Sequence, residues 1–134
     1  MLYIAALFGL IVGSFLNVLI DRLPKGQNVL WGRSRCDWCR RNLRWYELVP
    51  VLSFLAQGGR CRRCNKNLSL QYPVVELVTA IGFGLLYGLF GQSLPLYLSA
   101  VVIFCSFVVI GGADGKYQII PDSMVIFGSI AALV

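Results

Sequence analysis

The feature that most limits the fold of this chain is an uncharged stretch of 37 residues, from position 77 to position 113. One helical crossing of a bilayer needs about 20 apolar residues, so this stretch is too long for one crossing and suits two. Residues 91–95 contain the Gly, Ser and Pro that would separate them. The pattern predicts membrane helices at about 74–90 and about 95–113, joined by a tight turn on the outer side.

Two further apolar runs flank this stretch. Residues 1–20 carry no charge, and twenty helical residues reach about 30 Å, enough for one crossing. The run lacks the basic start and small-residue cleavage site of a signal peptide, which favours a first transmembrane helix with its N-terminus outside. A fourth run covers residues 123–134. The chain is 57% hydrophobic and only 13% charged, whereas soluble domains carry about 25% charged residues. We therefore predict an all-α polytopic membrane protein with about four transmembrane helices.

Small and polar residues gather on one face of the first predicted helix. Gly13, Ser14 and Asn17 lie at helical spacing. Such faces usually pack against another helix, because small side chains let two backbones approach closely. We favour this interpretation over a role for Asn17 in a binding or catalytic site, which remains the alternative.

Two Cys-x-x-Cys pairs form an internal repeat. Cys36 and Cys39 are separated from Cys61 and Cys64 by 21 residues, and each pair is followed by Asn-Leu. This arrangement is typical of a structural zinc site, in which four thiolates close a tetrahedral shell and leave no position for water. Disulfides or uncoordinated thiols are the alternative. A thiol oxidoreductase would more commonly use a single pair with a lowered pKa at a helix N-terminus.

Basic residues are concentrated around these cysteines. Residues 21–73 hold eleven of the twelve Lys and Arg side chains. Short basic loops between membrane spans stay cytoplasmic, where the reducing environment disfavours disulfides. The predicted domains are a first helix at 1–20, a cytosolic four-cysteine domain at 21–73 and a membrane region at 74–134. The apolar segment 45–55 should lie at the membrane surface, and the basic charge suits anionic lipid better than nucleic acid.

The acidic residues are few. Asp114 ends the third predicted helix, where a carboxylate is costly unless it has a task or a partner such as Lys116. Glu47 is most simply an ion-pair partner of a nearby arginine. Glu76 and Asp122 each lie near a predicted helix start, where the helix dipole favours a carboxylate, and for Glu76 a functional role has equal weight.

Taken in order, these motifs resemble those of the type IV prepilin peptidases. The resemblance covers essentially the whole chain. The motifs that carry it are Gly13-Ser14-Phe15-Leu16-Asn17, Arg22-Leu23-Pro24, the two cysteine pairs, Glu47-Leu48-Val49-Pro50-Val51-Leu52-Ser53, Tyr72-Pro73-x-x-Glu76-Leu77 and Asp114-x5-Ile120-Pro121-Asp122.

This resemblance implies a bifunctional leader peptidase/N-methyltransferase of the inner membrane, an intramembrane aspartyl protease of the Gly-x-Gly-Asp type. Such enzymes cut the leader of prepilin or pseudopilin precursors on the cytoplasmic side. They then methylate the new N-terminus, typically phenylalanine, with S-adenosylmethionine. The resemblance assigns the first catalytic aspartate to Asp114, and it makes Glu47 a candidate participant in methyl transfer.

The second catalytic aspartate of that family lies in a Gly-x-Gly-Asp motif further along. Residues 111–114 have Ala where the second Gly belongs, and Asp122 has no catalytic place in the pattern. An aspartyl mechanism needs two carboxylates that share a proton. The chain is therefore expected to be the N-terminal half of such an enzyme and inactive alone as a protease. The alternative function is a non-catalytic, zinc-stapled membrane adaptor of pilus or secretion machinery.

Overall fold

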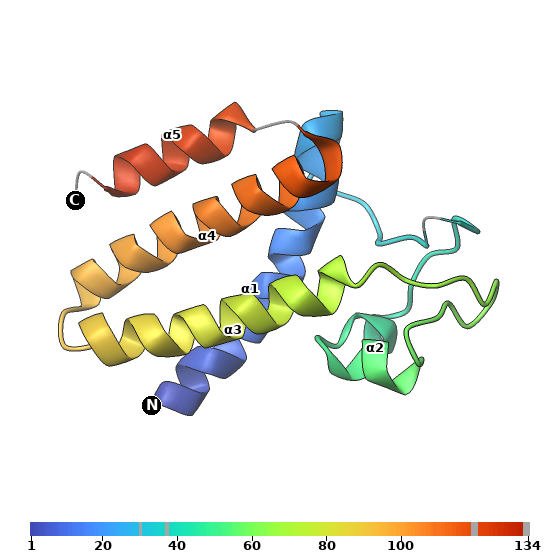
Figure 1. Cartoon of the computed structure of the whole chain (residues 1–134), viewed down its shortest axis with the longest axis horizontal. Helices are drawn as coiled ribbons and strands as arrows, with labels where there is room; N and C mark the ends of the chain where they lie inside the picture. The colour runs from blue at the N-terminus through green and yellow to red at the C-terminus, as the bar shows by residue number, and fades with distance from the viewer. Residues whose placement is uncertain (30, 37, 119–120, 133–134) are drawn as a thin grey trace.

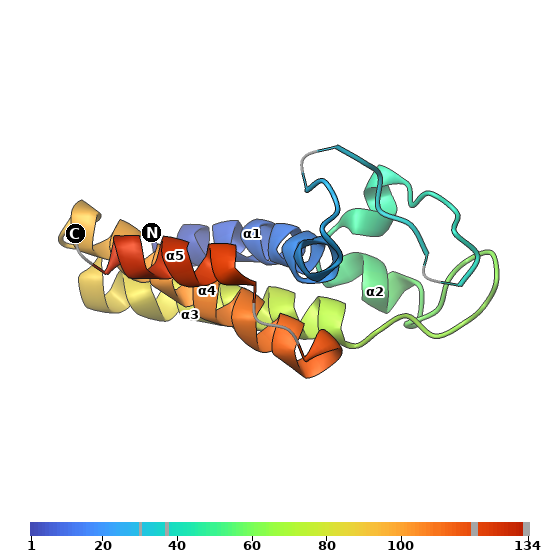
Figure 2. The same cartoon turned by 90° about the horizontal axis from the view of Figure 1, so that it is seen from above.

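The computed structural model describes residues 1–29, 31–36, 38–118 and 121–132. Its regular elements are α1 (Leu2–Arg22), η1 (Leu23–Lys25), η2 (Trp45–Leu48), α2 (Leu52–Ala56), α3 (Gln71–Phe90), α4 (Leu94–Tyr117) and α5 (Asp122–Ala131). In Figure 1, α3 and α4 run side by side in opposite directions, α5 packs on α4, and α1 crosses α3. Residues 26–70 form a small irregular domain at one end of the helices (Figure 2).

Three helices, α1, α3 and α4, are long and apolar enough to cross a membrane. Their outward faces carry large apolar side chains such as Ile4, Ile81 and Phe107, which are 61–69% exposed. A continuous apolar surface of this kind suits lipid rather than water. The all-helical membrane fold is thus confirmed. The fourth run forms α5, but its ten residues within the described part are shorter than a membrane span.

Glycines bring α1 and α3 into close contact. A Cβ atom on Gly9 would lie 2.8 Å from the Cα of Ala80, and one on Gly13 would lie 2.8 Å from the Cα of Glu76. No side chain fits at these distances, so glycine is required for the observed separation of the two backbones. The predicted packing face of the first helix therefore exists, and its partner is α3.

The core lies where α1, α3 and α4 meet. Leu16 and Ile20 of α1 pack with Val75 of α3 and Val109 of α4. A Cβ atom on Gly112 would lie 2.5 Å from the Cδ1 atom of Ile20, so α4 also approaches α1 through a glycine. This contact holds the last two turns of α4 against the end of α1 that faces the irregular domain.

Two helix boundaries differ from prediction. The second membrane helix begins at Gln71 rather than near 74, and Pro73 lies in its first turn. Proline is tolerated there because backbone N–H groups in the first turn of a helix have no carbonyl partner within the helix. The third continues to Tyr117 rather than ending near 113. Gly111 and Gly112 were expected to lie at its end, but each glycine costs a helix only about 1 kcal/mol relative to alanine. Asp114 therefore lies inside the last turns of α4.

Candidate functional site

The two cysteine pairs share the same pattern of backbone hydrogen bonds. The amide of Cys36 donates to the carbonyl of Arg41 at 3.0 Å, and the amide of Cys61 donates to the carbonyl of Lys66 at 3.0 Å. An isolated β-bridge closes each turn, between residues 35 and 42 and between residues 60 and 67. The internal repeat in the sequence is therefore also a structural repeat, and each copy is a tight turn that presents two thiols.

Both turns contain a residue in the left-handed backbone region directly after the second cysteine. Arg40 has a φ of 54° and Asn65 a φ of 55°. Their amides donate to the carbonyls of Cys36 and Cys61, each at 2.9 Å. A left-handed residue reverses the chain within a few residues, which turns both thiols of a pair toward the same point.

The four sulfur atoms form one cluster. All lie within 4.8 Å of one another, and two contacts join the pairs, at 3.8 Å from Cys36 to Cys64 and 3.9 Å from Cys39 to Cys61. A disulfide has a sulfur–sulfur distance of about 2.05 Å, so these cysteines are not bonded to each other. Zinc–sulfur bonds of about 2.3 Å in a tetrahedron place the sulfurs roughly 3.8 Å apart. The cluster therefore has the dimensions of a four-thiolate metal site.

The surroundings of the cluster favour ionisation of one thiol but oppose ionisation of all four. Amide groups of Cys64 and Arg63 hydrogen-bond to the Cys61 sulfur and lower its pKa to about 6. Burial raises the pKa of Cys36 to about 11, although it too receives amide hydrogen bonds. Several thiolates this close repel one another unless a cation lies between them. A divalent metal would supply that charge.

Glu47 supports the first cysteine turn. One of its oxygens accepts from the Arg41 guanidinium at 2.5 Å, and the other accepts from the Arg44 amide at 2.8 Å. Burial opposes ionisation of this carboxyl group, but the Arg44 amide and the Arg41 charge outweigh it and lower its pKa. The predicted ion pair with an arginine is confirmed. It links η2 to the turn that carries Cys36 and Cys39.

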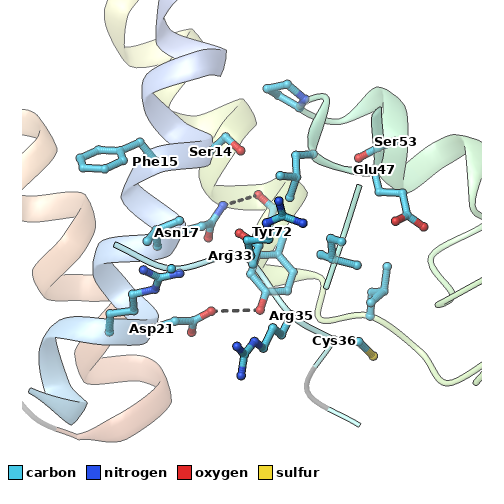
Figure 3. A pocket seen from close by; sticks show the side chains of 18 of the residues that line it. Ser14, Phe15, Asn17, Asp21, Arg33, Arg35, Cys36, Glu47, Ser53 and Tyr72 are labelled. Carbon is cyan, nitrogen blue, oxygen red and sulfur yellow. Dashed lines mark hydrogen bonds between the residues drawn. The ribbon is translucent and has the colours of Figure 1, made fainter. Parts of the chain in front are cut away.

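A cavity of about 1040 Å³ separates this domain from the helices (Figure 3). Its walls come from α1 and α3 on one side and from the irregular domain on the other. The sequence did not reveal it, although polar residues within the predicted spans were a signal. The polar side chains that the α1 and α3 wall contributes are Ser14, Asn17, Asp21, Arg22, Tyr72 and Glu76.

Glu76 has a different environment from the one predicted. It is the sixth residue of α3 rather than part of the first turn, so the helix dipole does not account for it. Its carboxylate accepts from the Val51 amide at 2.7 Å, and the residue is 7% exposed. Val51 has a φ of 59°, which a β-branched residue rarely adopts. The carboxylate thus holds an unfavourable turn of the irregular domain against α3.

Asp114 lies on the exposed surface of α4 near its end. Lys116, the expected alternative partner of Asp114, forms its ion pair with Asp21 at 2.6 Å. Asp21 also accepts from the hydroxyls of Tyr72 at 2.9 Å and Tyr117 at 3.2 Å. Sequence reasoning did not single out Asp21, although it is the first charged residue after the uncharged run.

Comparison with known proteins identifies relatives for nearly the whole chain. Residues 7–90 match the family model of the bacterial peptidase A24 N-terminal domain. A prepilin leader peptidase/N-methyltransferase of Myxococcus xanthus is 42% identical over 125 residues, which is 93% of this chain and 37% of that protein. The protein of the same description from Bacillus subtilis is 41% identical over 127 residues, or 95% of this chain and 51% of that protein. No solved structure matches.

The chain thus spans about half the length, or less, of these curated relatives. Its match to the family model includes α1 from residue 7 onward, the four cysteines and α3, which contribute to the metal-site cluster and the cavity. This chain therefore belongs to the prepilin peptidase A24 family, within which it corresponds to the N-terminal portion.

Proposed function

We propose that this chain is the zinc-binding N-terminal part of a prepilin leader peptidase/N-methyltransferase. The observation that carries the proposal is the similarity of at least 93% of the chain to enzymes of that description, at 41–42% identity. The order of its motifs supports the same conclusion. The activity requires the remainder of the enzyme, because the chain supplies one of the two catalytic carboxylates.

Zinc is the metal that the cysteine cluster suits best. Four sulfur ligands at tetrahedral spacing favour zinc, and the closed shell gives it a structural role. Bound zinc would join the two turns and so fix the domain that forms one wall of the cavity. The chain's own residues, and not the metal, would contact the substrate.

The proposed orientation places the four-cysteine domain in the cytoplasm and the three long helices in the inner membrane. Eleven basic residues in the segment 21–73 support it, since short basic loops are retained on the cytoplasmic side. The same charge would attract anionic lipid headgroups. Asp114 lies near the end of α4, and this orientation puts it at the cytoplasmic face.

Peptide hydrolysis in this proposal uses Asp114 as one half of an aspartyl pair. One carboxylate takes a proton from the attacking water while the other, protonated, donates to the carbonyl oxygen of the scissile bond. The position of Asp114 suits a prepilin or pseudopilin, whose basic leader lies in the cytosol and whose apolar helix lies in the membrane. Asp122, in the first turn of α5, is not assigned a catalytic role.

Methyl transfer is the second proposed activity. The amine nitrogen of the cleaved pilin forms a bond to the methyl carbon of S-adenosylmethionine, the carbon–sulfur bond breaks toward sulfur, and the nitrogen's proton passes to solvent. The described residues contain no glycine-rich loop between a strand and a helix, so this donor would bind in some other way. Glu47 is less suited to direct participation than the sequence suggested, because both its oxygens are already hydrogen-bonded.

The test is reconstitution of a longer enzyme. The chain is joined to, or co-expressed with, a C-terminal half that carries the Gly-x-Gly-Asp motif, and leader cleavage is measured with a prepilin substrate. We expect cleavage by the combined protein and none after Asp114→Asn, because an amide cannot accept the proton of water. Asp122→Asn is the matched control and should cut normally.

Normal cleavage by the Asp114→Asn variant would contradict the assigned role. A combined protein that binds prepilin without cutting or methylating it would instead support the adaptor function.

A further inference from the structure

The end of the cavity nearest the helices contains an unsatisfied hydrogen-bond acceptor. Asn17 is 4% exposed, and its Nδ2 atom donates to the carbonyl of Tyr72 at 3.0 Å. That bond determines which way the amide points, since only the nitrogen can donate to a carbonyl. The Oδ1 atom is buried and has no partner among the described residues. A buried acceptor without a donor is unfavourable, so this position suits a ligand that brings an N–H group.

The same end of the cavity contains a buried carboxyl group without an ion-pair partner among the described residues. Glu76 is 93% buried, and one of its oxygens accepts from the Val51 amide. The ion pairs in the described part of the chain involve Glu47 and Asp21, so Glu76 has no cationic partner there. A buried carboxylate is strongly stabilised by a cation that also donates hydrogen bonds.

Helix packing places these two acceptors close together. Asn17 contacts Tyr72, and Ser14, one turn earlier on α1, lies beside the carboxyl group of Glu76, one turn later on α3. Successive turns are about 5.4 Å apart along a helix axis. An ammonium group brings three N–H donors and a positive charge, which complement the Asn17 oxygen and the Glu76 carboxylate.

The rest of the cavity selects among ammonium compounds. Phe15, Phe54 and Leu48 supply apolar wall, whereas Arg33 and Arg35 add positive charge on the side of the irregular domain (Figure 3). Ligands with several positive charges are repelled by these arginines. A chain with one terminal ammonium, an apolar first side chain and carbonyl oxygens for the arginines is favoured. That description fits the free N-terminus of an apolar peptide.

We propose that Asn17 and Glu76 form the binding site for the N-terminal ammonium group of an apolar peptide. This inference rests on the methyl-transfer part of the proposed function and extends it. In that function, the peptide is a cleaved pilin. Neither residue is assigned a chemical step. Both are positioning residues that would hold the amine at the junction of the cysteine domain and the membrane helices.

The test measures peptide binding to the zinc-loaded chain in detergent micelles. The probe is a peptide with a free N-terminal phenylalanine followed by apolar residues and a dye at its C-terminus, compared with the same peptide acetylated at its N-terminus. We expect acetylation to weaken binding at least tenfold, because it removes the charge and two donors. Glu76→Gln, which keeps an acceptor for Val51, and Asn17→Leu should each weaken binding of the free peptide by a similar factor.

Asp122→Asn is the control, since it removes one exposed carboxylate far along the chain from the cavity residues, and it should bind normally. Helix content and zinc content are measured for every variant. Equal affinity for the free and acetylated peptides would overturn the proposal, and so would unchanged affinity after Glu76→Gln. The peptide comparison needs no variant, so it decides the matter even if a variant fails to fold.

Failure of this binding site can be distinguished from failure of the proposed function. Selective binding of the free amine by a chain whose combined enzyme does not methylate would support the site and refute the methyl transfer. Methylation by the combined enzyme without selective binding of the free amine would refute the site and support the methyl transfer.

Discussion

The side chains of Asp21 and Lys116 form an ion pair at 2.6 Å although 95 positions separate them in the sequence. Asp21 lies in the last turn of α1, and Lys116 lies in the last turn of α4. The hydroxyls of Tyr72 from α3 and Tyr117 from α4 donate to the same carboxylate. One side chain thus joins the ends of three membrane-length helices, and it sets the position of the turn that carries Asp114.

We predict that Asp21→Asn loosens the end of α4. The pair is partly exposed, so the loss of free energy of unfolding should be about 1 kcal/mol. Amide hydrogen exchange of residues 113–118 should become faster, whereas exchange in the middle of α4 should not change. The control is Asp122→Asn, which removes a carboxylate of the same kind from α5. Unchanged exchange at residues 113–118 would show that the glycine contact of α4 is sufficient by itself.

The metal site gives a second prediction. The purified chain should contain a single zinc ion, and Cys36→Ser or Cys64→Ser should release it, because three thiolates no longer close the shell. Limited proteolysis should then cut within residues 34–68 while the long helices stay intact. Cys105→Ser, in α4, is the matched control and should retain zinc. Absence of zinc from protein purified without chelator would contradict the proposal.

A third prediction concerns the close contact of α1 and α3. Gly13→Ala should destabilise the protein by about 1–3 kcal/mol, since the new methyl group meets the backbone of Glu76. Gly111→Ala is the control, because a Cβ atom there meets no atom within 4 Å. It should leave stability unchanged or raise it by about 1 kcal/mol through better helix propensity. Thermal unfolding in micelles measures both, and equal effects would mean that α1 and α3 can separate freely.

A pH dependence follows from Glu47. Its folded-state pKa is lowered by the Arg44 amide and Arg41 against the effect of burial. Its stabilising contribution is therefore present above the unfolded-state pKa of about 4.3 and is lost as pH falls through the folded value. We expect Glu47→Gln to weaken the cysteine domain by about 1–3 kcal/mol at neutral pH and by much less in acid.

Proteolysis rates of wild type and Glu47→Gln, compared across pH, measure this difference. Both proteins release zinc in acid as thiolates take up protons, so the comparison isolates the carboxylate. If the difference in proteolysis rate between the two proteins stays constant from neutral to acidic pH, the ion pair is not the source of that difference.

Membrane orientation gives the last prediction. With the cytosolic domain inside, a cysteine placed at Gln27 should be labelled only after permeabilisation, and one at Gln92 should be labelled in intact cells. The labelling is done on a background in which Cys105 is replaced, because the other four cysteines are expected to be held by zinc. The opposite pattern would overturn the orientation and the cytoplasmic location of Asp114.

The sequence alone determined the helices that are long and apolar enough to cross a membrane, and the turns that present the thiols. Both are local properties. Uncharged runs such as residues 77–113 have no favourable conformation in lipid other than a helix, because every backbone group must be hydrogen-bonded within the segment. The two cysteine turns are equally local, since each is closed by hydrogen bonds within a few residues of its own cysteines.

Only the tertiary structure decided which distant groups meet. Lys116 was a possible partner of Asp114 because the two are neighbours in the sequence, and the packing of α4 on α1 pairs it with Asp21. Glu76 was expected to serve a helix start, but the folded domain places the Val51 amide against it. The cavity depends on the relative positions of α1, α3 and the irregular domain that lies between them in the sequence. The hydrophobicity of a segment predicts that it is buried, but not which side chains it packs against.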